Sequence, residues 1–169
     1  IVVPTKDRYK YLKHLIELIN SIQSDQIELV LQDNTADNKE ILDFFSQKEY
    51  SFIKYNHNTQ PLPVCYNSDL AVLNSSGKYV CMIGDDDGIT RHIVDCVKWM
   101  EEYEIEAVVP SSISYHWPDY ISSITGNISG TLMYKPFSQT YKYIDSLCAL
   151  NELKDKGFIY LGELPLLYH

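Results

Sequence analysis

The sequence predicts an α/β domain with a mixed, mostly parallel sheet flanked by helices. Short β-rich runs alternate with segments of helical periodicity through residue 110, which is the order of βαβ units. The chain has 169 residues, of which 45% are hydrophobic. That composition is enough for one sizeable core and too little for two independent ones. Polar residues directly follow three predicted strands, where open α/β sheets bind their ligands.

The alternating part can be divided into its elements from residue type and spacing. The β-rich runs predict strands at residues 1–3, 28–31, 51–54, 79–83 and 107–109. Apolar residues spaced three and four apart predict amphipathic helices. These helices are expected at residues 11–19, 37–45, 64–73 and, after Asp87, around residues 93–100.

The pattern weakens beyond Pro110. Residues 111–130 are rich in serine, glycine and aromatic residues, which predicts long loops. A strand is expected at residues 130–135 and a helix at residues 141–154. Both ends of the chain look trimmed, because the sequence begins inside a strand-like run and stops in an apolar stretch.

Charge and composition exclude several classes of function. The net charge of -9 leaves no basic face for a phosphate backbone, so nucleic acid is not an expected partner. The chain has no apolar run of about 18 residues and no signal peptide, so we expect no membrane span. Cysteines without a C-x-x-C pair in apolar surroundings indicate core positions in a reducing compartment. They are Cys65, Cys81, Cys96 and Cys148. We expect a cytoplasmic protein that, in a longer form, can lie at the inner face of the membrane.

Three consecutive carboxylates, Asp85, Asp86 and Asp87, follow the predicted strand 79–83. Crowded like charges raise one another's pKa and repel, so such a run needs a compensating partner. Hard oxygen ligands suit Mg²⁺ or Mn²⁺, which keep open positions for substrate phosphates. Along an extended backbone Asp85 and Asp87 would face one way and Asp86 the other.

Other interpretations of the acidic run stay open. It can be a solvated turn that starts a helix, where aspartates favour the helix dipole. An EF-hand would need an acid at Ile83 and a glutamate at Val94. A haloacid-dehalogenase-type phosphatase would have threonine at Ile89 and would place its nucleophile after the first strand. A phosphatase or phosphotransferase built on Asp85 and Asp87 remains an alternative.

Four segments, taken in order, resemble the family 2 glycosyltransferases, which have the GT-A fold. The segments are IVVPTKDR at residues 1–8, VLQDNT at 30–35, Asn67 ahead of SGKYV at 76–80, and IGDDD at 83–87. The corresponding family patterns are V-V-I-P-T-Y-N-R, V-D-D-x-S, N-x-G…A-x-G-x-Y and L-D-x-D-D. Each segment alone is weak, whereas four in the right order after the right strands are specific.

The resemblance implies roles for individual residues and for the two parts of the chain. Residues 1–110 would form the nucleotide-sugar-binding half of a GT-A domain, and residues 111–169 would begin a truncated acceptor-binding half. Asp33 would hydrogen-bond the base, usually uracil, and Asp87, assisted by Asp85, would bind the metal of a DxD motif. The implied nucleotide-binding residues are Pro4, Thr5, Asp7, Arg8, Asp33, Asn67, Asp85 and Asp86.

The reaction implied is an inverting, metal-dependent transfer of a sugar from a nucleotide-diphospho-sugar, with UDP expected as the nucleotide. The acceptor would be a glycan, a polysaccharide or a lipid-linked sugar, and the cofactor Mn²⁺ or Mg²⁺. Two departures from the family pattern concern the nucleotide. Gln32 replaces the first acid of the D-D pair. Tyr66 stands where many relatives have an arginine that reaches the nucleotide, and Lys6 or Arg8 can compensate for the missing arginine.

The catalytic base is expected beyond His169. Within the chain, Glu163 and Asp119 are the late candidates, although both also fit ordinary loop and turn positions. The aromatic segment at residues 115–117 can stack on an acceptor sugar or pack under a loop. A GT-A module that binds nucleotide without completing catalysis is therefore a further alternative.

Overall fold

The computed structural model describes residues 1–108, 145, 147, 148, 151, 167 and 168. The chain divides into two compact units, one formed by Ile1–Val108 with Glu163–His169 and the other by Val109–Gly162. The first unit contains all the strands and helices labelled below.

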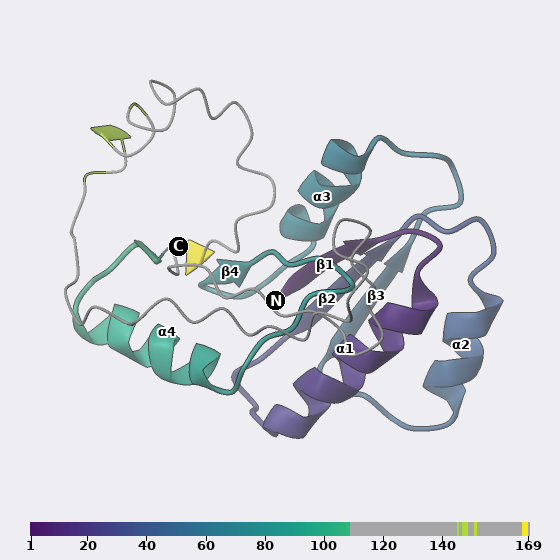
Figure 1. Cartoon of the computed structure of the whole chain (residues 1–169), viewed down its shortest axis with the longest axis horizontal. Coiled ribbons are helices and arrows are strands. Elements are labelled where there is room, and N and C mark those ends of the chain that lie inside the picture. The colour runs from purple at the N-terminus through teal and green to yellow at the C-terminus, as the bar shows by residue number, and fades with distance from the viewer. Residues whose placement is uncertain (109–144, 146, 149–150, 152–166, 169) are drawn as a thin grey trace, which may run out of the picture. The chain divides into compact units, whose positions relative to one another are not determined.

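A parallel sheet forms the centre of the first unit (Figure 1). Its strands are β1 (Val2–Thr5), β2 (Leu29–Asp33) and β3 (Ile53–His57), in the order β1-β2-β3. The register aligns Thr5 with Asp33 and Asp33 with His57. The three strands therefore end level with one another, at one edge of the sheet.

Another chain segment runs along the free side of β1. Strand β4 (Val80–Cys81) precedes Met82, which forms a parallel bridge with Val2. The N–H of Ile83 donates to the carbonyl of Val2 at 3.1 Å. On its other side β1 bonds to β2, because the carbonyls of Ile1 and Thr5 accept N–H groups from that strand and the residue after it. The residues after Ile83 thus leave the sheet beside the end of β1.

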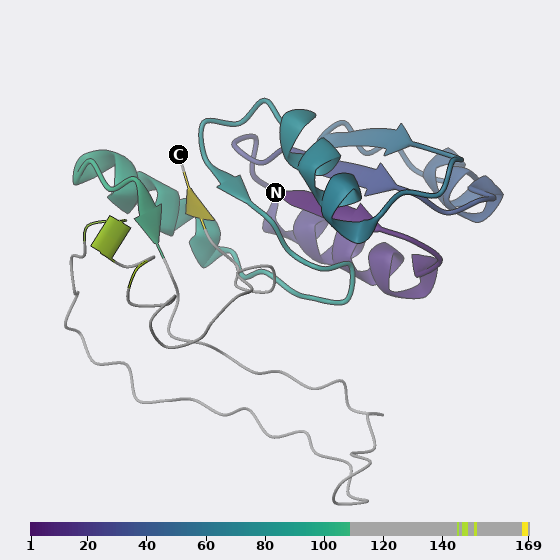
Figure 2. The same ribbon diagram turned by 90° about the horizontal axis from the view of Figure 1, so that it is seen from above.

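Helices cover both faces of this sheet (Figures 1 and 2). On one face lie α1 (Tyr9–Ile22) and α2 (Lys39–Ser46), and on the other lies α3 (Val64–Leu73). Helix α4 (His92–Glu102) leads to β5 (Ala107–Val108), and β6 (Leu167–Tyr168) pairs antiparallel with both β4 and β5. The sheet region as a whole is therefore mixed.

Alternation along the strands assigns each side chain to one face. Val3 and Leu31 are fully buried in the core that includes α1 and Ile41 of α2, whereas Val2 and Val30 are buried against α3. Because both faces are covered, these strands are continuously apolar rather than alternating. This double burial explains why the β-rich runs were recognisable from the sequence.

The predicted elements of residues 1–108 are present, with shifted ends. β1, β2 and β3 continue about two residues further than predicted, into the polar residues Thr5, Asp33 and His57, because the hydrogen-bonded ladder continues past the apolar positions. Helix α2 begins at Lys39, whose N–H is capped by the carboxylate of Asp37 at 2.9 Å.

The predictions for later residues fall mostly outside the described part of the chain. The strand at 130–135 lies wholly outside it. Of the predicted helix 141–154, Leu147, Cys148 and Asn151 are described and are helical. The carboxylate of Asp145 accepts the N–H groups of Leu147 and Cys148 at 3.1 Å each, which is a helix cap.

The cysteines differ from the expectation of uniform core positions. Cys81 is buried and Cys96 half-buried, but Cys65 and Cys148 are exposed. Cys65 lies on the outer face of α3, where the apolar residues surround the helix and do not form one inward stripe, so the sequence did not distinguish the faces. All four thiols are free.

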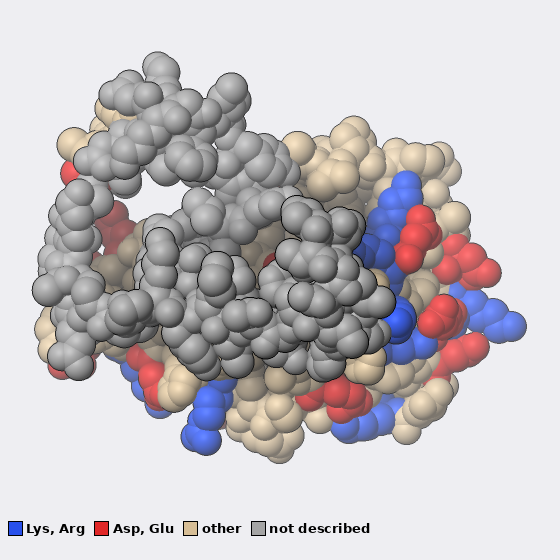
Figure 3. All heavy atoms as spheres, viewed as in Figure 1, with Lys and Arg blue, Asp and Glu red and all other residues tan. Residues whose placement is uncertain are grey.

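Charged side chains of both signs are interspersed on the face seen in Figure 3. Helices α1 and α2 are joined by the ion pair of Lys13 with Glu40, at 2.7 Å. Within the part of the chain that the structure describes, no helix has the length and apolar character needed to cross a bilayer.

Candidate functional site

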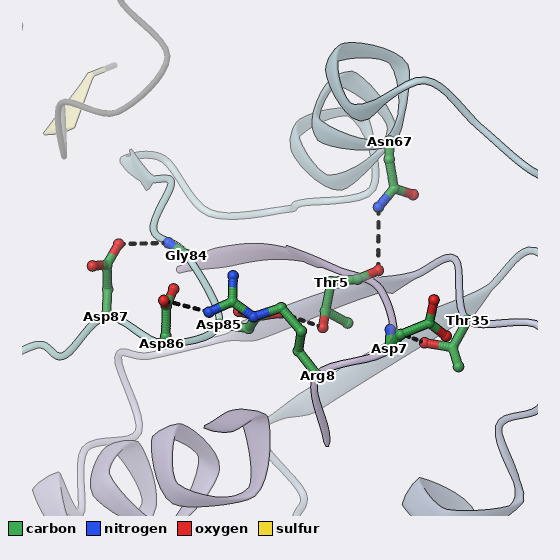
Figure 4. Close-up of polar contacts among 9 residues, drawn as sticks. All are labelled: Thr5, Asp7, Arg8, Thr35, Asn67, Gly84, Asp85, Asp86 and Asp87. Carbon is green, nitrogen blue, oxygen red and sulfur yellow. Dashed lines mark hydrogen bonds and ion pairs between the residues drawn. The ribbon is translucent and has the colours of Figure 1, made fainter. Parts of the chain in front are cut away.

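The candidate site lies where β1 and the segment after β4 end side by side (Figure 4). The hydroxyl of Thr5, the last residue of β1, donates to Asp85 Oδ2 at 2.6 Å. The two residues are 80 positions apart in the sequence, and both are buried. The segments 1–8 and 83–87 of the sequence therefore meet in one place.

Arg8 connects two of the three consecutive acids. Its Nε lies 3.1 Å from Asp85 Oδ1, and its Nη2 contacts Asp86 Oδ2. Both oxygens of Asp85 are thus engaged, one by Thr5 and one by Arg8. Burial raises the pKa of Asp85 above its ordinary value, and the hydrogen bond from Thr5 and the charge of Arg8 oppose that shift.

Asp87 has a different environment from Asp85. Its side chain is exposed, and its Oδ2 accepts the N–H of Gly84 at 2.8 Å. The N–H of Asp87 in turn donates to the carbonyl of Gly84 at 3.2 Å, which closes a turn. The expected alternation of the three acids along an extended backbone is therefore wrong. In the turn, Asp85 points into the sheet edge while Asp86 and Asp87 are exposed.

Gly84 lies against the side chains of two of the acids. A Cβ atom at Gly84 would lie 3.0 Å from Asp86 Oδ1 and 3.1 Å from Asp87 Oδ2. These distances are shorter than ordinary van der Waals contacts, so any side chain at this position would push both carboxylates away.

Asp33, the residue expected to contact the base, is fully buried. Its Oδ2 accepts hydrogen bonds from the hydroxyls of Tyr9 at 2.6 Å and Tyr55 at 2.7 Å, and its Oδ1 accepts the N–H of Thr35 at 2.8 Å. Burial and then the bond to Asp33 raise the pKa of both tyrosines. The carboxylate thus joins α1, β3 and the loop after β2, and it presents no surface to a base.

The residues after β2 fix the neighbouring loops. The Asn34 amide donates to the carbonyls of Asn58 and Gln60 at 2.7 and 2.6 Å and accepts the N–H of Leu62 at 2.8 Å. The Thr35 hydroxyl accepts the N–H of Asp7 at 2.8 Å. Asp7 has a φ of 57°, a left-handed conformation that aspartate tolerates better than most residues.

Asn67 connects α3 to the ends of the strands. Its Nδ2 donates to the carbonyls of Gln32 at 3.2 Å and Thr5 at 3.5 Å, and the residue is buried. Its Oδ1 is buried without a hydrogen-bond partner in the structure. Pro4, which is half-buried in β1, pairs with Gln32 of β2. Asn67 and Pro4 therefore support the site from within the fold.

The donor atoms of the acidic turn can be compared with the needs of a divalent cation. Within the residues that the structure describes, no three His, Cys, Asp or Glu side chains are arranged to hold a metal by themselves. Mg²⁺ is usually held by one or two carboxylates together with substrate phosphates and water. The exposed carboxylates of Asp86 and Asp87 fit that mode of binding. The residues present therefore fit a cation bound jointly with a diphosphate.

The site predictions thus have different outcomes. Thr5, Arg8, Asp85 and Asp86 are brought into direct contact, and Asp87 lies in the same turn. The late candidates lie outside the described residues, namely Asp119, Glu163, His169 and the segment 115–117. Sequence reasoning missed Tyr9, Tyr55 and Asn34. The tyrosines look like ordinary core residues, and only the polar run after β2 indicated that this loop matters.

A hollow lies at the amino ends of β2 and β3, opposite to the ends that carry the candidate site. It has a volume of about 610 Å³ and is lined by residues such as Gln23, Glu28 and Lys54. None of the predicted site residues lines it. The polar side chains converge instead at the carboxyl ends of the strands.

Comparisons with known proteins identify relatives of the chain. The family model for glycosyl transferase family 2 matches residues 1–152. No curated protein matches the chain. Among solved structures, the chain is similar to S. aureus TarS 1-349 in complex with UDP-GlcNAc, with 18% identity over 63% of this chain and 32% of that chain and a TM-score of 0.53. S. aureus TarS 1-349 alone matches over 92% of this chain and 48% of that chain, with 19% identity and a TM-score of 0.54.

At these identities the likeness to TarS concerns the fold. It confirms the prediction of a GT-A fold with a mixed, mostly parallel sheet flanked by helices. The chain spans about a third to a half of the length of these TarS chains.

Proposed function

The chain belongs to glycosyl transferase family 2, and from this premise we propose that the protein transfers a sugar from a nucleotide-diphospho-sugar to the hydroxyl of an acceptor glycan. The observation that carries the proposal is the meeting of Thr5, Arg8 and Asp85 at the carboxyl edge of the sheet. Two TarS structures of the same fold contain UDP or UDP-GlcNAc. We therefore propose a UDP-sugar as the donor.

The nucleotide is proposed to lie along the ends of β1 and β2. Thr5, Asp7 and Arg8 would line it from the loop after β1, and Asp86 would meet it from the acidic turn. Pro4 and Asn67 would shape the floor beneath these residues. Asp33 is proposed to hold Tyr9 and Tyr55 in place, because its buried carboxylate has no face free for the base.

A divalent cation, Mn²⁺ or Mg²⁺, is proposed as the cofactor. Asp87 would be its direct ligand, because its carboxylate is exposed and retains one oxygen beside the bond to Gly84. Asp85 is proposed to assist by orienting Arg8 and Thr5, since both of its oxygens are engaged by them. The cation would neutralise charge on the diphosphate.

The proposed reaction is a single displacement that inverts the anomeric centre. The acceptor oxygen bonds to the anomeric carbon as the bond from that carbon to the diphosphate oxygen breaks, and a carboxylate base takes the hydroxyl proton. Arg8 would stabilise the negative charge that develops on the leaving nucleoside diphosphate. The acceptor is proposed to be a glycan, a polysaccharide or a lipid-linked sugar. Asp119 and Glu163 remain candidates for the base, besides residues beyond His169.

A binding experiment tests the donor and metal proposals together. Thermal shift and calorimetry with UDP, GDP and TDP, with and without Mn²⁺, should show metal-dependent stabilisation with UDP. Asp87→Ala should abolish this metal dependence, because it removes the proposed ligand. Asp69→Ala is the matched control, since Asp69 is an exposed aspartate on α3. Unchanged metal-dependent UDP binding in Asp87→Ala would refute the assignment of Asp87.

The phosphatase alternative is not favoured by the geometry. A phosphoaspartate mechanism needs a carboxylate oxygen free to attack phosphorus. Asp85 is 4% exposed, and both of its oxygens are bonded. A transfer assay distinguishes the enzyme from a module that only binds nucleotide. Such a module, in the intact protein, would bind UDP-sugar with metal but transfer no sugar to any acceptor.

A further inference from the structure

Arg8 holds a position in the acidic turn that a cation from solution would otherwise take. Its guanidinium contacts Asp85 through Nε and Asp86 through Nη2. One positive charge thus contacts two of three consecutive negative charges and neutralises one of them. Crowded carboxylates need such compensation, and a guanidinium offers several donors in a fixed planar fork.

The backbone of Arg8 is fixed while its side chain has room to move. Arg8 precedes the first residue of α1, and its carbonyl accepts the N–H groups of Tyr11 and Leu12 at 3.0 and 3.2 Å. The side chain is 44% exposed. The guanidinium can therefore change partners without any change in the helix.

The two carboxylates that Arg8 contacts differ in exposure. The side chain of Asp85 is 5% exposed and is also held by Thr5, whereas that of Asp86 is 44% exposed. The contact with Asp85 is thus screened little by solvent, and the contact with Asp86 is screened strongly. An incoming cation would break the contact with Asp86 first.

We propose that Arg8 is the resident counter-ion of the acidic turn, that a divalent cation displaces its guanidinium from Asp86, and that the released guanidinium then binds the donor diphosphate. Metal binding and nucleotide binding are coupled through this one side chain. The inference rests on the proposed function for its second half. Its first half, competition between Arg8 and metal, concerns the protein without nucleotide.

The guanidinium suits both positions because carboxylate and phosphate accept the same forked pair of donors. While Arg8 occupies the turn, the site has less net negative charge and binds metal weakly. When metal and diphosphate arrive together, the charge that Arg8 supplied is replaced and its donors gain a new acceptor. The free energies of the two binding events are therefore linked.

The test is a titration of the intact protein with Mn²⁺ in the absence of nucleotide, by calorimetry or by electron paramagnetic resonance of free Mn²⁺. Arg8→Gln removes the competing charge and should bind Mn²⁺ about fivefold or more tightly than wild type. Arg8→Lys keeps the charge but lacks the planar fork, so its affinity should lie between the two. Lys10→Gln removes an equal charge from an exposed position two residues away and should have little effect.

A second titration measures UDP binding at saturating Mn²⁺. Arg8→Gln should lose about tenfold in UDP affinity, within the usual range for coupled sites, while Lys10→Gln should retain wild-type affinity. Equal or weaker Mn²⁺ affinity in Arg8→Gln, or equal gains in Arg8→Gln and Lys10→Gln, would overturn the inference. Failure of the wild-type protein to bind UDP with any metal would instead overturn the proposed function. Arg8→Lys keeps the test decisive if Arg8→Gln does not fold.

Discussion

Replacing Asp33 distinguishes a structural carboxylate from one that contacts the nucleotide. In Asp33→Ala, the Tyr9 hydroxyl and the Thr35 N–H, both buried, lose their acceptor. A buried polar group left unpaired costs about 1–3 kcal/mol, so two such groups cost on the order of 4 kcal/mol together. The half-buried Tyr55 can turn its hydroxyl to water and adds less. Asp33→Asn retains one acceptor oxygen and should cost roughly 1–2 kcal/mol.

The assay is urea unfolding followed by circular dichroism, with UDP affinity measured on the folded variants. Tyr66→Phe is the control, because Tyr66 is an exposed tyrosine on α3 at 52% exposure and its hydroxyl can be removed at little cost. The structural interpretation requires Asp33→Ala to lose stability even without any ligand. Stability within about 1 kcal/mol of wild type, well under the cost of two unpaired groups, combined with lost UDP binding, would refute the reasoning.

Two further predictions follow from the tyrosines and from the acidic turn. The raised pKa values of Tyr9 and Tyr55 mean that folding keeps phenol protons which the unfolded chain loses above about pH 10. The contribution of these two tyrosines to the free energy of unfolding is therefore complete below that pH, and it is lost as the pH rises through their pKa values in the folded protein. Absorbance at 295 nm, which follows tyrosine ionisation, combined with unfolding at each pH should show this loss. Tyr9→Phe should lose less stability at alkaline pH than the wild type. Gly84→Ala should change the free energy of unfolding by less than about 1 kcal/mol, because only the exposed side chains of Asp86 and Asp87 have to shift. It should bind UDP with Mn²⁺ at least about tenfold more weakly, since its Cβ would displace two carboxylates that the proposed complex needs. Gly88→Ala is the control in the same binding assay, because its Cβ would meet only Leu18 at an ordinary 3.5 Å, and equal affinities in the two variants would contradict the role given to Gly84.

The strands β1 and β2 were predictable because burial on both faces leaves continuous apolar runs, and helices α1 and α2 because burial on one face leaves apolar residues three and four apart. Val2, Val3 and the residues of β2 from Leu29 to Leu31 are such runs. The meeting of Thr5 with Asp85 also followed from the general rule that polar residues after parallel strands share one edge. Both predictions depended only on the period of the pattern and the direction of the strands.

The roles of individual acids were less predictable, because they depend on which side chains fill the surrounding space. Nothing in the run VLQDNT indicates that tyrosines from α1 and β3 would enclose Asp33. The three acids of the turn look equivalent in sequence, yet one is buried and two are exposed. The reason is that the backbone is not extended here but forms a turn, closed by the hydrogen bond from the N–H of Asp87 to the carbonyl of Gly84. Such distinctions require the tertiary structure.

Pro4 lies in β1 beside the point where that change of backbone begins. In a parallel sheet, alternate residues of a strand bond to opposite neighbours, and Val2 bonds to Ile83 while Ile1 and Thr5 bond toward β2. Pro4 is the next residue of β1 that faces the same side as Val2. Proline has no amide hydrogen, so at this position β1 cannot donate a backbone hydrogen bond to the chain after β4, although the carbonyl of Pro4 can still accept one. The pairing of these two chains therefore lacks one possible hydrogen bond close to the point where the carboxylates gather.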